Sequence, residues 1–299
     1  MLMGSCAASI VICTRNRANS LARALRSLAA SEPPESGGWE VIVVDNASTD
    51  DTASVIHRFA DEAGRVVPIR TIREARPGLA HARNAGLRAA RGEIILLTDD
   101  DCLVSAEWLR TALRLLHDDP MQLIGGRVEL FDPEDLPLAI KTARERATLK
   151  DFSALWGFVH GANMAMGRAV IARIGGFDVR FGAGAALRSA EDTDFVFRAW
   201  RAGVPVVYEP DLLVHHHHGR RGARTWRRQS GDYAIGIGAM AAKHAHAGDY
   251  RLVKAAYWYL RAALRLWRDD RRAWPELRAR LQVLTGALGY WRVRNRAAA

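Results

Sequence analysis

Ile94-Ile95-Leu96-Leu97-Thr98-Asp99-Asp100-Asp101-Cys102 is an apolar run that ends abruptly in three adjacent carboxylates. The apolar part predicts a strand that is buried on both faces of a sheet. Three neighbouring Asp side chains repel one another, so the triplet favours a compensating cation. A hard divalent cation that bridges a phosphorylated substrate would supply it. The alternative is a solvated acidic turn that caps a helix beginning near Ser105, and the triplet alone does not choose between the two.

Size and composition describe a globular protein. The 299 residues, of which 49% are hydrophobic, suffice for one large core or two unequal ones. Cys6, Cys13 and Cys102 are odd in number and lack metal-ligand spacing, which predicts reduced cysteines in a cytoplasmic protein. The apolar opening lacks the basic leader and cleavage site of a signal peptide. No apolar stretch reaches the roughly 20 residues that span a bilayer, so we expect no transmembrane segment.

The positive charge of the chain is concentrated in its last part. Residues 219–299 hold 18 Lys or Arg and 5 Asp or Glu, whereas the remainder holds 25 basic and 28 acidic residues. The net charge of +10 therefore arises from this segment. A basic tail on a near-neutral body predicts an anionic partner, and membrane headgroups and nucleic acid are the two obvious classes. Charge alone does not choose between them.

The first 117 residues alternate short apolar runs with helical patterns, which is typical of a doubly wound α/β sheet. In such sheets, ligands bind beyond the carboxyl ends of the strands. The expected strands cover residues 8–13, 40–44, 66–72 and 93–97, and the expected helices cover residues 19–30, 52–63, 79–90 and 106–116, with Asp50 or Asp51 and Ser105 as caps.

Polar residues follow three of these strands. Arg15 and Arg17 come after the first strand, Asp45 ends the second, and the acidic triplet ends the fourth. One rim of the sheet would gather these donors, acceptors and metal ligands, which fits a nucleoside diphosphate. The turn after the first strand lacks the glycine-rich fingerprint of a dinucleotide site, and no phosphate loop with Lys occurs, which argues against NAD and ATP.

The second part of the chain divides near residue 219. A mixed pattern up to residue 218 predicts strands over residues 126–131, 162–166, 204–208 and 212–216 and a helix over 192–202, whereas residues 219–299 form a basic helical extension. This division makes residues 1–218 one domain. One helix of the extension either packs its apolar side on the body or lies on a membrane surface. Its cations are Arg251, Lys254, Arg261, Arg265 and Arg268, and its apolar residues are Leu252, Tyr259, Leu260, Leu266 and Trp267.

Five segments resemble the motifs of the inverting family 2 glycosyltransferases, which have the GT-A fold. They are SIVICTRNR at 9–17, VIVVDNASTDDT at 41–52, GLAHARNAGL at 78–87, TDDDC at 98–102 and AEDTDFVFR at 190–198. Each motif alone is weak, but all five occur in the order of the family. The resemblance covers roughly residues 8–218 and implies a mostly parallel, Rossmann-like sheet flanked by helices, to which the C-terminal helical extension is added.

The resemblance implies a nucleotide pocket at the start of the chain. Thr14 and Arg15 would lie near the base or ribose, Arg17 would end this part of the pocket, and Asp45 would accept a hydrogen bond from the base. Arg83 would support the pocket, although it could equally be a structural cation that caps its own helix.

The acidic triplet resembles the DxD motif of the family. Asp99 would lie near the ribose and the metal, Asp101 would bind the metal, and Asp100 lies between them in the nucleotide site. The implied cofactor is Mg²⁺ or Mn²⁺, which neutralises the departing diphosphate. A histidine often completes the metal shell in such enzymes, and we favour His216 within 215–218 because neighbouring histidines on a strand alternate between faces. The alternative is a solvated histidine loop.

The resemblance also implies a catalytic base. Asp192, directly after Glu191, would accept the proton of the attacking hydroxyl, and Glu191 would bind the acceptor. The alternative is that acidic residues at a helix start interact with the helix dipole, which best explains Asp194. Arg198 lies one turn further on and would pair with Asp194.

Residues 157–166 resemble the stretch that lines the donor sugar. His160 and Gly161 belong to it, and Gly161 would let the backbone approach the sugar closely. Trp156 would either stack on a sugar ring or belong to the core. Residues 175–182 resemble the flexible acceptor loop that precedes the Glu-Asp pair.

Together these features predict an inverting, metal-dependent glycosyltransferase. It would move a sugar from a nucleoside diphosphate sugar, UDP- or dTDP-linked, to a hydroxyl of a glycan or lipid-linked acceptor. The alternatives are a sugar-1-phosphate nucleotidyltransferase, whose glycine-rich signature loop we do not find, and a non-catalytic module that docks on membrane or nucleic acid. We expect a cytoplasmic enzyme of envelope polysaccharide biosynthesis without a nucleic-acid partner, and peripheral contact with the inner face of the membrane through the basic helices stays open.

Overall fold

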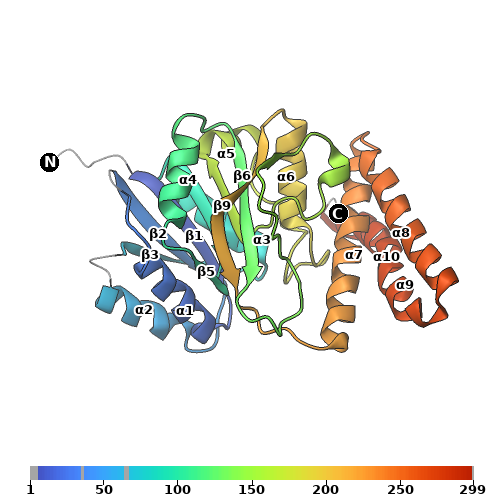
Figure 1. The fold of residues 1–299 in the computed structure, drawn as a ribbon, viewed down its shortest axis with the longest axis horizontal. Helices are drawn as coiled ribbons and strands as arrows, with labels where there is room; N and C mark the ends of the chain where they lie inside the picture. Colours follow the sequence, from blue (N-terminus) through green and yellow to red (C-terminus); the bar gives the residue numbers. More distant parts are fainter. Residues whose placement is uncertain (1–5, 35–36, 64–66, 298–299) are drawn as a thin grey trace.

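The computed structural model describes residues 6–34, 37–63 and 67–297, in which one sheet of nine strands lies between helices (Figure 1). The strands are β1 (Cys6–Thr14), β2 (Gly38–Asp45), β3 (Ile69–Arg73), β4 (Ile94–Asp99), β5 (Cys102–Val104), β6 (Leu123–Leu130), β7 (Ala147–Thr148), β8 (Asn163–Gly167) and β9 (Val206–His216). The helices are α1 (Ala18–Ala29), α2 (Thr52–Ala63), α3 (Leu79–Ala89), α4 (Trp108–His117), α5 (Arg168–Ile174), α6 (Glu191–Arg201), α7 (Ala223–His246), α8 (Arg251–Asp269), α9 (Trp274–Arg280) and α10 (Gln282–Ala297), with short 3-10 turns over Phe152–Ala154 and Arg271–Ala273.

The predicted α/β class is confirmed. The strand order is β3-β2-β1-β4-β8-β6-β9-β5, and β7 pairs with β9. The first four strands in this order run parallel, β8 runs antiparallel to β4 and β6, and β9 runs parallel to β6. Thr14 therefore pairs with Asp45, and Cys13 pairs with Asp99, so the polar ends of β1, β2 and β4 meet at one rim of the sheet.

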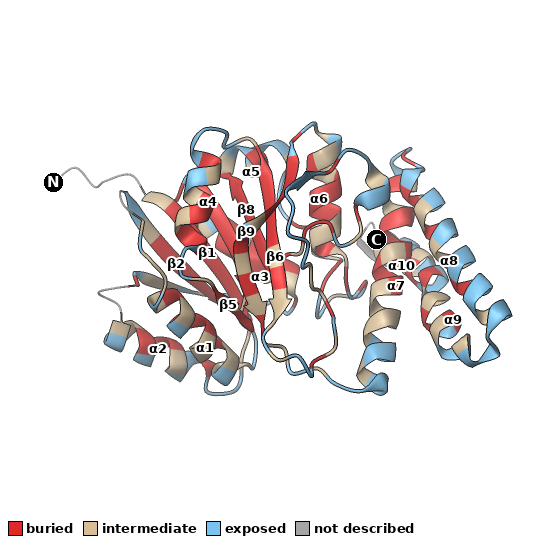
Figure 2. Ribbon diagram, viewed as in Figure 1, coloured by how far each residue is buried: buried red, intermediate tan, exposed pale blue. Residues whose placement is uncertain are grey.

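Each face of the sheet has its own core, because successive side chains of a strand point to opposite faces. On one face, Ile10 and Ile12 pack with helices α1, α2 and α4. On the other face, Val11 and Cys13 pack with α3 and α6. Strands β1, β2, β4 and β8 are accordingly buried along nearly their whole length, as Figure 2 shows for β1, β2 and β8, whereas β3 is half-buried to exposed and β7 is exposed.

Several sequence predictions need correction. Ser105 does not cap a helix, because residues 102–104 form strand β5 and helix α4 begins only at Trp108, after Glu107. The two strands expected over 204–208 and 212–216 form the single strand β9, and helix α5 was not predicted. Asp50 does accept a hydrogen bond from the Thr52 N–H at the start of α2, 3.1 Å away. Residue 66, the expected start of the third strand, lies outside the described residues.

The basic extension packs on the α/β part of the chain. Ala239 and Met240 of α7 share one core with Phe197 of α6. Helices α7 and α10 cross at close range, since a Cβ added to Gly238 would lie 1.8 Å from the Val283 carbonyl oxygen. A domain boundary at residue 219 stays a prediction. In the described part of the chain, we find no helix with both the length and the apolar character needed to cross a membrane.

Candidate active site

A cavity of about 650 Å³ opens at the carboxyl ends of β1 and β4 and extends to the start of α6. Asp101 and Asp192, which are far apart in sequence, both line it. Asp45 is not among its lining residues, whereas its neighbour Asn46 is. The other sequence-predicted site residues all line the cavity: Thr14, Arg15, Arg17, Arg83, Asp99, Asp100, Asp101, Trp156, His160, Gly161, Glu191, Asp192 and His216.

The acidic triplet is held by the first strand–helix turn. Asp100 accepts hydrogen bonds from the Thr14 hydroxyl and from Arg17, both at 2.7 Å, and the same Arg17 nitrogen lies 2.7 Å from Asp101. Burial raises the pKa of Asp100 to about 6 against the charge of Arg17. Burial also opposes ionisation of Asp101, but the contacts with His216 and Arg17 outweigh it, so the pKa of Asp101 lies well below its usual range.

Strand pairing brings His216 to the triplet. Cys102 in β5 pairs with His216 in β9, and the His217 N–H donates to the Asp101 carbonyl oxygen at 2.7 Å. As a result, His216 Nε2 lies 3.3 Å from Asp101 Oδ1. The sequence placed His216 and His218 on one face of the strand, and their rings lie edge to face with centroids 4.7 Å apart. His218 contacts the Leu136 carbonyl oxygen at 3.0 Å and has a structural role.

These residues fit a divalent cation. Donor atoms of Asp101, Cys102 and His216 lie within 4.8 Å of one another. Burial raises the pKa of the Cys102 thiol well above its usual range, so the sulfur stays protonated and is a poor ligand. A carboxylate and an imidazole are ligands that Mn²⁺ accepts. Within the described residues, His216 Nδ1 is buried without a hydrogen-bond partner, and Asp99 lies outside this donor group.

Arg83 connects the triplet to the start of α6. It is only 3% exposed and pairs with Asp99 at 3.1 Å and with Glu191 at 2.9 Å. A Cβ on Gly161 would lie 2.6 Å from its guanidinium, so the residue at 161 must be small for Arg83 to bridge both carboxylates. Burial and the adjacent Asp192 raise the pKa of Glu191 to about 7, against the charge of Arg83.

Two backbone N–H groups orient Asp192. Its Oδ2 accepts from the Gly161 N–H at 2.9 Å, and its Oδ1 accepts from the Thr193 N–H at 2.7 Å. The backbone before it is strained, because Arg188 and Ala190 have φ angles of 62° and 72°. Such strain occurs at functional sites, where surrounding contacts hold the conformation. The carboxylate is thus fixed at the cavity wall.

The predicted sugar-lining residues differ in exposure. His160 Nε2 is buried and lacks a hydrogen-bond partner within the described residues, and burial lowers the pKa of His160. The ring is therefore neutral at neutral pH. Trp156 is half-buried and Gly161 is buried, and both line the cavity.

No pattern in the sequence indicates that the basic extension helps to form the cavity. Gln229, Tyr233 and Ile237 of α7 and Tyr259 of α8 line it, together with Arg220 from the preceding loop. The domain boundary predicted at residue 219 assigned these side chains to the extension and therefore not to the site. Aromatic residues at helical spacing could have indicated a second wall, but the same spacing is typical of ordinary helix packing.

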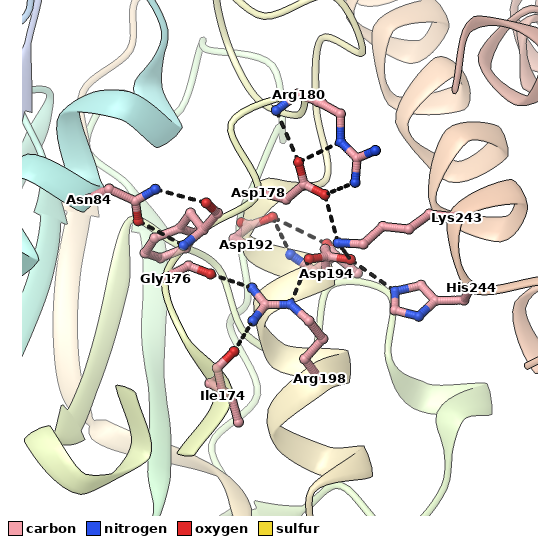
Figure 3. Close-up of polar contacts among 12 residues, drawn as sticks. Asn84, Ile174, Gly176, Asp178, Arg180, Asp192, Asp194, Arg198, Lys243 and His244 are labelled. Carbon is pink, nitrogen blue, oxygen red and sulfur yellow. Dashed lines mark hydrogen bonds and ion pairs between the residues drawn. The ribbon is translucent and has the colours of Figure 1, made fainter. Parts of the chain in front are cut away.

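A buried ionic cluster joins the extension to α6, as Figure 3 shows. Asp194 is fully buried and accepts from Arg198 at 2.9 Å, which confirms the predicted pair. It also accepts from Lys243 at 2.7 Å and contacts His244 Nε2 at 2.9 Å, both from α7. Lys243 lies 2.9 Å from Asp178 as well, in the segment predicted to be the acceptor loop. The helix dipole alone therefore does not account for Asp194.

Replacing Lys243 by Met should lower the free energy of unfolding by about 1–3 kcal/mol, because the buried carboxylate of Asp194 and the half-buried carboxylate of Asp178 lose a charged partner. Urea unfolding at neutral pH measures this change. Lys254→Met, on the exposed side of α8, removes the same charge and should have an effect below about 0.5 kcal/mol. Equal effects of the two substitutions would contradict the structural role of the cluster.

Comparison with solved structures identifies the fold as GT-A. The mannosyltransferase PcManGT from Pyrobaculum calidifontis, solved in complex with GDP-Man and Mn²⁺, superposes with a TM-score of 0.65 at 24% identity, over 100% of this chain and 81% of that one. The sequence model described as glycosyl transferase family 2 matches residues 9–175, more than half of the chain. The chain belongs to this family.

Two relatives of known name are also glycosyltransferases. The glycosyltransferase AglE of Haloferax volcanii is 25% identical over 214 residues, which make up 70% of this chain and 66% of that protein. The pre-mycofactocin glycosyltransferase of Mycobacterium tuberculosis is 27% identical over 245 residues, which make up 79% of this chain and 48% of that protein. The chain thus spans less than two thirds of the length of both relatives.

Proposed function

We propose that this protein is an inverting, metal-dependent glycosyltransferase. It takes a sugar from a nucleoside diphosphate sugar, UDP- or dTDP-linked, and transfers it to a hydroxyl of a glycan or lipid-linked acceptor. One observation carries the proposal: the Asp101–His216 pair and the oriented carboxylate of Asp192 line a single cavity. Family membership and the names of the relatives favour this activity over a nucleotidyltransferase or a non-catalytic module.

The nucleotide would lie along the ends of β1 and β4. Arg15 and Arg17 supply cations, and Asp99 presents a carboxylate oxygen that suits a ribose hydroxyl. Arg83 keeps Asp99 in place through their ion pair. Asp45 lies just outside the lining, where its carboxylate accepts from the Ser48 N–H at 3.0 Å, and its contact with the base stays a prediction.

Asp101 and His216 would hold Mn²⁺ or Mg²⁺, and the mixed carboxylate and imidazole set favours Mn²⁺. The bound cation would stabilise the charge that develops on the departing diphosphate. Arg17, 2.7 Å from both Asp100 and Asp101, adds a second positive charge at this end of the cavity.

Asp192 would accept the proton of the acceptor hydroxyl while the oxygen attacks the anomeric carbon opposite the diphosphate, which inverts the configuration. Its two N–H donors leave lone pairs of the carboxylate available and keep it from rotating. Glu191, buried beside it, would bind the acceptor. A cytoplasmic place of action stays a prediction from the cysteine content.

Thermal stabilisation by UDP, GDP and dTDP, each with and without Mn²⁺, tests the proposal. A ligand at about 100 times its Kd adds about 2.7 kcal/mol to the free energy of unfolding. We expect a clear rise in Tm for one nucleotide, only when Mn²⁺ is present, and slow hydrolysis of the corresponding sugar nucleotide. Absence of a metal-dependent shift with all three nucleotides, together with absence of hydrolysis across a panel of sugar nucleotides, would reject it.

A further inference from the structure

The outer side of α8 carries large apolar side chains that the fold does not cover. Tyr257, Trp258 and Leu264 are 54%, 50% and 49% exposed. Val253, Tyr257 and Leu264 lie on one stripe of the helix, because they are separated by four and seven residues. The side of the helix that carries Leu252 is already buried in the core. Helix α8 lies at the end of the molecule remote from α1 and α2, and its outer side is exposed in Figure 2.

Cations flank this apolar stripe. Lys254, Arg261 and Arg265 are exposed, and α8 contains no acidic residue before Asp269, its last position. Within the described residues, none of these three cations lies within 4.0 Å of a carboxylate. Arg261 instead lies over the Trp258 ring, 5.3 Å from its centroid, and donates to the Tyr257 hydroxyl at 3.2 Å. The long cations and the aromatic rings thus form one continuous surface.

We propose that this surface, formed by Val253, Lys254, Tyr257, Trp258, Arg261, Leu264 and Arg265, docks on an anionic lipid membrane. Aromatic rings and long cationic side chains are stable at the level of the lipid headgroups, where the rings enter the apolar boundary and the charges meet anionic phosphates. Helix α8 is held by α7 and α9, so it presents the surface without having to fold on the membrane.

Nucleic acid and a second copy of the chain fit the α8 surface less well than a membrane does. Nucleic acid would use the cations and aromatic rings, but Val253 and Leu264 cannot stack on bases. A second copy of the chain in a two-fold contact would bring identical cations together, which like-charge repulsion opposes. A membrane uses both the aliphatic and the cationic part of the surface.

Docking would bring the cavity to the membrane. Tyr259 of the same helix lines the cavity, so the wall that α8 forms would lie next to the bilayer. The inference that the cavity lies next to the bilayer rests on the proposed function. It favours a lipid-linked acceptor over a free glycan as the substrate. The docking itself does not depend on catalysis.

Co-sedimentation with vesicles tests the docking without donor or acceptor. Phosphatidylcholine vesicles that contain phosphatidylglycerol should bind the protein, salt should weaken the binding, and phosphatidylcholine alone should bind poorly. Arg261→Gln with Arg265→Gln should weaken binding by about 25-fold, since each cation contributes about fivefold. Tyr257→Ser with Leu264→Ser should weaken it by at least about tenfold.

Two matched control variants distinguish the effect of the α8 surface on vesicle binding from the effect of the overall charge and of exposed apolar residues elsewhere. Arg58→Gln with Arg114→Gln removes two exposed cations from α2 and α4, and Leu284→Ser with Leu288→Ser removes two exposed apolar residues from α10. Both should bind vesicles like the unaltered protein, and all variants should keep its Tm. Equal loss in the control and α8 variants, tighter binding to single-stranded RNA than to anionic vesicles, or an α8-dependent dimer in solution would overturn the proposal.

Discussion

Asp192→Asn is expected to lower kcat for sugar transfer by about 10²–10⁴-fold, because an amide cannot accept the proton of the attacking hydroxyl. Asn occupies nearly the same volume, and one of its atoms can still accept from the Gly161 or Thr193 N–H, so the cavity should keep its shape. Nucleotide affinity should be almost unchanged, since Asp192 lies at the α6 end of the cavity. Steady-state kinetics and nucleotide titration of the same preparation measure the two effects.

The matched control is Asp61→Asn, which removes one exposed carboxylate from α2 far from the cavity. It should leave kcat unchanged. A normal kcat in Asp192→Asn would eliminate this residue as the base. A parallel loss of nucleotide binding and of Tm would instead show that the substitution disturbs the fold.

Asp101→Asn should remove the effect of Mn²⁺ on nucleotide binding and lower transfer by about 10³-fold, because a bound cation contributes several kcal/mol to charge stabilisation in the transition state. Chelation of the metal should abolish activity of the unaltered protein, and added Mn²⁺ should restore it. In the variant, added Mn²⁺ should not change the Tm measured in the presence of nucleotide, and it should not change the rate of sugar transfer. Calorimetric titration with Mn²⁺ in the presence of the nucleotide provides a readout independent of turnover.

Asp101 also pairs with Arg17, so a comparison with Arg17→Gln separates the ion pair from the metal. Arg17→Gln should weaken nucleotide binding but keep its Mn²⁺ dependence. If Asp101→Asn still showed a metal-dependent rise in Tm with nucleotide, the proposed ligand set would be wrong.

Most of the first half of the fold could be predicted because its strands are nearly continuous apolar runs. Residues 8–13, expected as a strand, lie within β1. Of the strand expected over 93–97, residues 94–97 lie in β4, which ends at Asp99, the first residue of the acidic triplet. The convergence of Thr14, Asp45 and Asp99 followed from parallel pairing, since parallel strands end at the same rim. The resemblance to the family then assigned roles to residues that the strand pattern had only placed at one rim of the sheet.

Other elements could not be predicted because their pattern is short or ambiguous. Strand β5 has three residues and exists through its pairing with β9, which no local pattern signals. Asp194 looked like an ordinary acidic residue in a first helical turn, and only the packing of α7 surrounds it with Lys243 and His244. The contribution of Tyr233 to the cavity wall has the same origin.

The sequence by itself determined the α/β class, the acidic rim and thirteen of the residues that line the cavity, because strand periodicity and the order of short motifs are local properties of the chain. Tertiary structure alone decided that His216 reaches Asp101, that Arg83 is buried between Asp99 and Glu191, and that the basic extension closes the cavity and exposes the outer side of α8. These features depend on strand register and helix packing between segments far apart in the chain, and such contacts leave no periodic signal in either segment.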